Sequence, residues 1–149
     1  MAQRMQVADV SPCLYYDDAA AAVEWLCTAF GLKKRLLVLG EGSTVVHSEL
    51  SLGHCVIMVS SAAKRPGFIA QRRLPAAAHM LSVYVADPDA HYATARAAGA
   101  RIVSELHDAE YGARGYEADD LEGHRWYFGN SRPGGYWRPD GLPNVVQHG

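Results

Sequence analysis

The chain repeats itself at about half its length, and this repeat limits its possible folds more than any other feature. Residues 14–18 (LYYDD) return as 83–87 (VYVAD), about 69 residues later, and residues 53–58 (GHCVIM) match 123–128 (GHRWYF) at an offset of about 70. A repeat of this period indicates two copies of one supersecondary unit that bury their apolar faces together. We therefore expect two modules related by an approximate two-fold axis, with any binding site between them.

The composition is typical of one globular domain over residues 1–149. Hydrophobic residues make up 49% and charged residues 20% of the chain, which supplies enough apolar material for a core. The net charge of −2 comes without a run of one sign, so neither nucleic acid nor a membrane surface is expected as a partner. The first residues lack an apolar signal segment. We expect a cytoplasmic protein whose three cysteines are buried, reduced thiols.

The first module is expected over about residues 8–60, in the order strand, helix and three strands. Residues 9–16 are typical of a strand, and residues 19–30 are Ala-rich with apolar side chains at helical spacing. Asp17 or Asp18 is expected as the N-cap of this helix, and the glycine after it as its left-handed end. Turn glycines then separate three short strands, expected near 34–40, 44–50 and 54–60.

The second module follows a connector at residues 61–78 and repeats the plan over about 79–130. Residues 79–86 are expected as a strand, and Asp87-Pro88 indicates the start of a helix over 88–98. Further strands are expected near 101–104, 114–119 and 124–128, followed by an irregular tail at 131–149 that is expected to lie over the surface. The predicted fold class is α+β: two tandem βαβββ modules form a curved eight-stranded mixed sheet, with helices on the outer face. Its concave inner face is suited to a small ligand.

Together with the paired modules, residues 111–126 (YGARGYEADDLEGHRW) resemble the vicinal oxygen chelate superfamily, in particular its uncharacterised glyoxalase-like branch. This superfamily contains glyoxalase I, bleomycin-resistance proteins and extradiol dioxygenases, and the resemblance covers about residues 8–130. It implies a small-molecule ligand in the concave face and a homodimer. It does not choose between enzymes and proteins that only bind, because one fold carries many functions.

The resemblance also implies where a metal would be held. Metal-using members place one ligand on the first strand and one on the last strand of each module. In this chain those positions fall on Val10, Ile57, His79 and Tyr127. Valine and isoleucine have no donor atom, and a neutral tyrosine is a poor ligand for a divalent ion. The expectation is therefore no family-type metal site and no cofactor, with His79 the only position retained.

A site for an organic ligand is expected on the concave face instead. Strand alternation places Arg125 and Tyr127 on that face, with Trp126 and Phe128 in the core. Arg125 is suited to a ligand carboxylate, and pairing with an acidic neighbour is an equal expectation. The predicted ligand-binding residues are Tyr16, His47, Glu49, His79, Tyr111, Arg125 and Tyr127.

The other members of this set have separate reasons. His47 and Glu49 share one strand face, so an acidic arm can meet His79 and supply a general base; solvated surface charges are the alternative. Tyr16 is expected to face inward. Tyr111 follows a polar loop at 104–110, where it either borders the cleft or packs its rim.

Two functions are left open by the sequence. The first is a glyoxalase- and bleomycin-resistance-like protein that binds a small, mostly apolar organic molecule without metal. The alternative is a metal-dependent lyase, isomerase or dioxygenase of the same superfamily, with a divalent ion at a relocated site that uses His79 with His47, Glu49 or Glu117. Whether the chain is an enzyme is not decided at this level.

Overall fold

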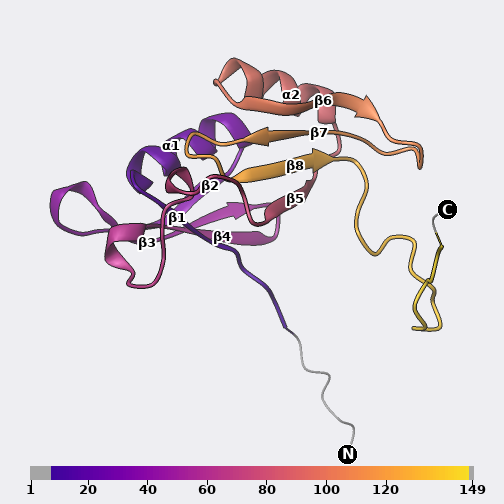
Figure 1. Cartoon of the computed structure of the whole chain (residues 1–149), viewed down its shortest axis with the longest axis horizontal. Coiled ribbons are helices and arrows are strands. Elements are labelled where there is room, and N and C mark those ends of the chain that lie inside the picture. The colour runs from indigo at the N-terminus through magenta and orange to yellow at the C-terminus, as the bar shows by residue number, and fades with distance from the viewer. Residues whose placement is uncertain (1–7, 148–149) are drawn as a thin grey trace, which may run out of the picture.

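The computed structural model describes residues 8–147 and contains two modules in the expected order (Figure 1). The first comprises β1 (Cys13–Tyr16), α1 (Ala19–Phe30), β2 (Lys33–Leu39), β3 (Val45–Leu52) and β4 (Cys55–Ser61). The second comprises β5 (Met80–Tyr84), α2 (Pro88–Ala97), β6 (Arg101–Asp108), β7 (Arg114–Asp119) and β8 (Arg125–Gly129). Short 3-10 turns occupy Glu41–Ser43 before β3, and Ala62–Lys64 and Gln71–Arg73 in the connector.

Local sequence signals set the ends of both helices. Asp18 is the N-cap of α1, and its side chain accepts a hydrogen bond from the backbone N of Ala21 at 3.1 Å. Gly31 ends this helix at φ 78°, a left-handed conformation that glycine adopts without strain. Asp87 caps α2 in the same way through the backbone N of Ala90, with a proline in the first turn. The predicted extent of α1 is confirmed, and α2 ends at Ala97, one residue before its predicted end.

The eight strands form two four-stranded sheets, one from each module. The strand orders are β1-β4-β3-β2, which we call sheet A, and β5-β8-β7-β6, which we call sheet B. In each sheet the pair that contains the module's first strand is parallel, and the other pairs are antiparallel. The identical order confirms the repeat and the α+β fold of two βαβββ modules.

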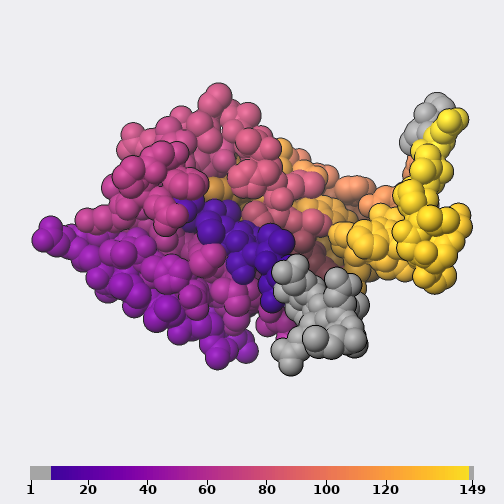
Figure 2. Space-filling view, turned by 90° about the horizontal axis from the view of Figure 1, so that it is seen from below, coloured from indigo at the N-terminus to yellow at the C-terminus, as the bar shows by residue number. Residues whose placement is uncertain are grey.

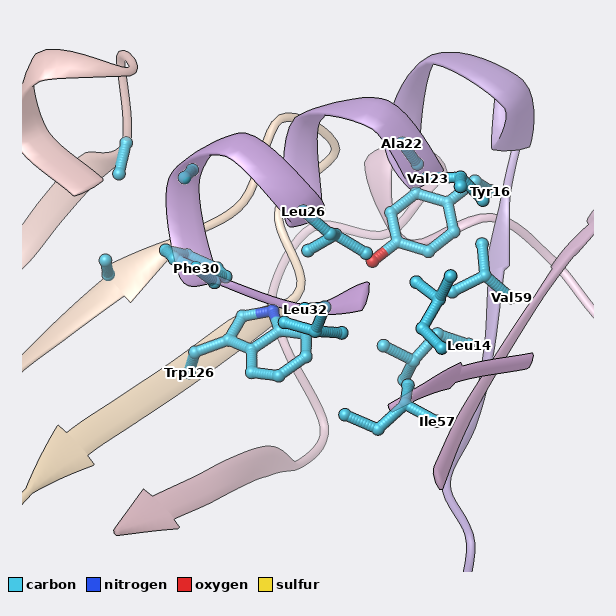
Figure 3. Packing of buried hydrophobic residues seen from close by; sticks show 14 of the residues in the cluster. Leu14, Tyr16, Ala22, Val23, Leu26, Phe30, Leu32, Ile57, Val59 and Trp126 are labelled. Carbon is cyan, nitrogen blue, oxygen red and sulfur yellow. The ribbon is translucent and has the colours of Figure 1, made fainter. Parts of the chain in front are cut away.

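Helix α1 packs against both sheets and joins them in one core. Figure 3 shows Leu26 and Phe30 of α1 with Leu14 and Ile57 of sheet A and Trp126 of sheet B. The ring centroid of Phe30 lies 5.3 Å from that of Trp126. Burying a large apolar side chain contributes about 1.5–3 kcal/mol. The two modules therefore stabilise one another through shared aromatic residues.

The turn between β7 and β8 connects the second module to the start of α1. The side chain of Glu122 is buried, and its two carboxylate oxygens accept hydrogen bonds from the backbone N atoms of Asp17 and Asp18, both at 2.8 Å. The Nε2 atom of His124 donates to the carbonyl oxygen of Tyr15 at 3.0 Å. A carboxylate at this position satisfies N–H groups that the helix leaves free and is favoured by the helix dipole.

Three details differ from the expectations. Strand β6 continues to Asp108, so much of the segment expected as a polar loop at 104–110 is strand. Cys13 and Cys55 are exposed rather than buried. The tail after Asn130 projects from one end of the molecule instead of lying over its surface (Figure 2).

Candidate functional site

Strand β8 separates the core from the open face of sheet B. Trp126 and Phe128 are fully buried in the core, whereas Arg125 and Tyr127 are half-buried on the opposite face. The predicted orientation of these four side chains is confirmed, because successive residues of a strand point to opposite faces of the sheet.

Two paired glycines make room for the Tyr127 side chain on this open face. Gly115 of β7 lies opposite Gly129 of β8. A Cβ atom at Gly115 would lie 2.5 Å from the Tyr127 hydroxyl oxygen, and one at Gly129 would overlap the Tyr127 ring. The ring therefore lies directly against the backbone of both strands, an approach that only glycine permits.

A pocket of about 630 Å³ forms beside this ring, and we call it the tyrosine pocket. Three phenol rings from separate segments and a proline give it apolar area, and hydroxyl groups give it hydrogen-bond donors and acceptors. Its volume suits a small organic molecule. Its lining residues are Ser82 of β5, Tyr111 of the β6–β7 loop, Tyr127 of β8, and Ser131, Pro133 and Tyr136 of the tail.

A cation–π contact holds the start of the tail against sheet B. The guanidinium carbon of Arg132 lies 3.9 Å from the ring centroid of Tyr84 on β5. Its neighbours Ser131 and Pro133 thereby form one wall of the tyrosine pocket. A contact of this kind contributes about 0.5–1 kcal/mol at an exposed position, so it biases the position of the tail without locking it.

The surroundings of Tyr127 disfavour negative charge. The pKa of its phenol is raised above the usual value, chiefly because burial removes water from it, and further because Tyr111 and Glu117 lie nearby. Glu117 is its direct cross-strand neighbour on β7. At neutral pH, Tyr127 is therefore an uncharged group that donates and accepts hydrogen bonds.

Arg125 is engaged by an acidic neighbour. Its Nε atom lies 2.9 Å from Oδ1 of Asp119, and one terminal nitrogen lies 3.3 Å from Oδ2, a two-bond arrangement that carboxylates and guanidinium groups favour. Arg125 lines a separate charged groove of about 640 Å³, together with Arg72 and Arg101. The acidic pairing, which the sequence left open, is present, and Arg125 does not line the tyrosine pocket.

His79 lies apart from both cavities. It is exposed, immediately precedes β5, and lines a small pocket of about 220 Å³ that also includes Cys13, Tyr15 and His124. The structure therefore does not bring His79 together with Arg125 or Tyr127 in one pocket.

His47 and Glu49 form a pair on the open face of sheet A. The Nε2 atom of His47 lies 2.9 Å from a carboxylate oxygen of Glu49. Their cross-strand neighbours are Val38 and Leu36 on β2, and Met58 lies beside Glu49 on β4. The prediction that His47 and Glu49 share one strand face is confirmed. Neither residue lines the tyrosine pocket.

The prediction that Tyr16 faces the ligand is wrong. Its side chain is fully buried under α1, and its hydroxyl donates to Oδ2 of Asp120 at 2.5 Å. Leu14 and Tyr16 both point to the helix side of sheet A, so β1 presents Tyr15 on the other face. Of the seven predicted residues, the structure brings Tyr111 and Tyr127 together in one pocket.

The chain is similar to known proteins in both sequence and fold. Residues 6–128 match the family model described as Glyoxalase/Bleomycin resistance protein/Dioxygenase superfamily. The chain belongs to this superfamily. It is also similar to Uncharacterized protein Rv0887c of Mycobacterium tuberculosis, with 29% identity over 126 residues that cover 80% of this chain and 72% of the relative.

Solved structures agree with this assignment. TioX from Micromonospora sp. ML1 is 32% identical, with a TM-score of 0.66 over 83% of this chain and 98% of TioX. A glyoxalase/bleomycin resistance protein/dioxygenase from Nocardioides is 19% identical, with a TM-score of 0.63 over 87% of this chain and 91% of the other. The fosfomycin resistance protein FosX from Listeria monocytogenes shares the fold at 10% identity, with a TM-score of 0.66 over 87% of this chain and 97% of FosX.

The four positions assigned to a metal from the sequence, Val10, Ile57, His79 and Tyr127, do not share one site in the structure. Val10 precedes β1 and is 94% exposed, whereas Ile57 is buried in the core. The sequence prediction placed Ile57 at a ligand position on the concave face, and this is wrong. Ile57 points into the core, and its neighbour Val56 is exposed on the other face of β4. Between residues 8 and 147, no group of three or more His, Cys, Asp or Glu side chains is arranged to hold a metal ion.

The sequence missed most of the pocket wall in this superfamily member. Ser131, Pro133 and Tyr136 belong to the tail, which has no counterpart in the repeat and no periodic pattern. The available signal was an aromatic residue within a segment rich in glycine and proline. The glycines 115 and 129 were a second signal, but their meaning depends on the strand register.

Proposed function

We propose that this protein binds a small organic molecule in the tyrosine pocket without a metal ion and thereby sequesters it. The observation that carries this proposal is the convergence of Tyr111, Tyr127 and Tyr136, from three separate segments, on one cavity of about 630 Å³. Aromatic side chains supply large contact areas, and the serine hydroxyls at the rim can orient a ligand. The superfamily includes bleomycin resistance proteins by its description, and sequestering a small molecule is one way in which a protein can confer resistance.

Two buried acids of this chain, Asp120 and Glu122, have structural roles. Asp120 accepts hydrogen bonds from the side chains of Tyr16 and Trp126, and Glu122 accepts from the start of α1. These carboxylates are occupied by structural donors. A carboxylate that acts as a general base must instead lie within hydrogen-bond reach of the proton that it removes.

We also propose that two copies pair through the open face of sheet A. Leu36, Val38 and Val56 lie on this sheet with 43%, 40% and 38% of their surface exposed. Clustered exposed apolar side chains are typical of protein contacts. A Leu36→Glu variant should shift the mass measured by light scattering from two copies to one. An unchanged mass in the variant, or a monomeric parent protein, contradicts the pairing.

The cytoplasmic location expected from the sequence stays a prediction. Within residues 8–147, no helix of the structure has the length and apolar character needed to cross a membrane.

The binding proposal is tested on chelator-treated protein whose metal content has been measured by elemental analysis. Calorimetric titration with Ni, Zn, Mn and Fe(II) precedes a ligand-observed NMR screen of small aromatic compounds. We expect binders that do not depend on added metal and that lose affinity in Tyr111→Leu and Tyr127→Leu. A Phe68→Leu variant, which removes an exposed aromatic ring outside the pocket, is the control. A stoichiometric metal requirement, or binding that survives in both tyrosine variants, contradicts the proposal.

A further inference from the structure

The tyrosine pocket presents several phenol rings to whatever occupies it. Tyr111 and Tyr136 are 77% and 70% exposed, so their rings are available to a ligand. The third ring, Tyr127, is held against the sheet by the glycines at 115 and 129. The face of an aromatic ring carries negative potential and attracts cations, and aromatic cages recognise quaternary ammonium groups in this way.

The arginines of β7, β8 and the tail are already engaged by other side chains. Arg125 pairs with Asp119, and Arg138 pairs with Asp140. Arg132 stacks on Tyr84. The remaining member of this set, Arg114, pairs with Asp89 and Asp108.

Glu117 places a carboxylate on the same face, beside the tyrosine pocket. It lies directly across from Tyr127 on β7 and is only half-buried. Within the described chain it takes part in none of the ion pairs. A carboxylate outside an ion pair gives its surroundings a negative potential, which attracts cations and repels anions. Arg125 shares the charge of Glu117 only in part, because the Arg125 pKa is raised chiefly by the hydrogen bond to Asp119, which already holds that guanidinium, and further by Glu117.

The direction of the Tyr127 pKa has the same cause in part. Besides burial and Tyr111, the charge of Glu117 contributes to raising the pKa of the Tyr127 phenol, because a second negative charge beside it is disfavoured. An anionic ligand would meet the same repulsion.

Resting on the proposed function, we infer that the ligand of the tyrosine pocket is a cationic aromatic compound, a protonated or quaternary amine attached to an apolar ring. The ring packs between the phenol rings of Tyr111, Tyr127 and Tyr136. The ammonium group lies over an aromatic face, on the side of Glu117. This arrangement joins an apolar contact area to a positive charge that complements the aromatic faces and the Glu117 carboxylate.

Three probes of similar shape and different charge separate the contribution of charge to the affinity from that of shape. Benzyltrimethylammonium is the cation, neopentylbenzene is its uncharged isostere, and benzylsulfonate is the anion. Each is titrated into the full chain and followed by NMR shifts of the tyrosine ring protons. The cation should bind roughly tenfold more tightly than the uncharged probe. Glu117→Gln should weaken cation binding by roughly threefold to fivefold and leave the uncharged probe unaffected.

Glu41→Gln is the matched control, because it removes the same charge from an exposed turn before β3. It should leave all three affinities unchanged. Equal binding of the uncharged probe and the cation, or an unchanged cation affinity in Glu117→Gln, overturns the inference while the pocket itself stands. If none of the three probes shifts the tyrosine signals, the pocket does not bind aromatic molecules, and the proposed function fails together with the inference.

Discussion

The hydroxyl of Tyr16 donates a 2.5 Å hydrogen bond to Oδ2 of Asp120, which links the first strand of one module to the β7–β8 turn of the other. The same carboxylate oxygen accepts from Nε1 of Trp126 at 3.2 Å. The other oxygen accepts from the backbone N atoms of Glu122 and His124. Each buried lone pair thus meets a donor, which is the condition under which a buried carboxylate is tolerated.

Replacing Tyr16 by phenylalanine should destabilise the fold by about 1–3 kcal/mol, because Asp120 loses its one hydroxyl donor while remaining buried. The free energy of unfolding is measured by chemical denaturation. Tyr15→Phe removes a hydroxyl from the preceding residue of the same strand and should have a small effect. A Tyr16→Phe variant as stable as Tyr15→Phe would show that the Tyr16–Asp120 bond contributes little.

The loss of stability at alkaline pH should also depend on Tyr16. Burial and the neighbouring Asp120 raise the pKa of Tyr16 well above its usual value. The contribution of a neutral tyrosine is fully present below the unfolded pKa of about 10 and is lost as pH rises above it, because only the unfolded chain then releases the proton readily. Tyr16→Phe should therefore flatten the decline above about pH 10. A residual slope is expected from Tyr116, whose pKa is also raised by burial. An identical alkaline profile in the parent protein and the variant would contradict this assignment.

Removing the Glu122 carboxylate should cost about 3 kcal/mol or more. Glu122→Ala leaves the N–H groups of Asp17 and Asp18 without their partner and takes an acid away from Arg72, which lies 3.3 Å from it. Urea denaturation checks the loss, and Glu110→Ala, an exposed acid of the β6–β7 loop, is the control. Equal stability of the two variants would show that the N–H groups of Asp17 and Asp18 do not need the Glu122 carboxylate.

The free energy of unfolding should fall at acid pH because of His91 on α2. Its Nε2 atom donates to the carbonyl oxygen of Phe30 at 3.3 Å, so Nδ1 is left to accept from the Tyr116 hydroxyl at 2.5 Å. Burial lowers the pKa of this imidazole. The unfolded chain therefore takes up the proton first, and stability should fall as pH drops below the unfolded value of about 6.5.

His91→Gln should reduce this acid dependence, whereas His107→Gln, at an exposed position on β6, should retain it. Thermal unfolding followed across the acid range distinguishes the two. Equal acid slopes in both variants would assign the effect to other groups.

The architecture was predictable because its signals are local or repeated. Asp18 and Asp87 cap the helices through their own side chains, and Gly31 ends α1, so no distant contact is needed to place these boundaries. The core side of β8 was predictable because Arg125 and Tyr127 alternate with Trp126 and Phe128. The face of β1 was not predictable, because all four residues from Cys13 to Tyr16 are apolar or aromatic and no polar side chain sets the phase.

The candidate site was predicted only in part because its walls come from segments without a pattern. Tyr127 follows from alternation, and Tyr111 follows from its place before a strand. Tyr136 belongs to the tail, whose start contacts the sheet through Arg132 and Tyr84, a tertiary interaction between distant residues. Sequence spacing contains no information on such a contact.

The placement of Tyr127 should depend on the glycine beneath it. Gly129 does not require a positive φ, so alanine suits its backbone, but the added Cβ would overlap the Tyr127 ring. Gly129→Ala should therefore move this ring, cost about 1–3 kcal/mol of stability, and abolish ligand binding in the tyrosine pocket. In a Tyr127→Ala background the same glycine change should cost less, because the obstructing ring is gone. The double-mutant cycle should then show a coupling of about 0.5–3 kcal/mol. Additive costs would show that the glycine acts through the backbone instead, and unchanged binding in Gly129→Ala would remove Tyr127 from the site.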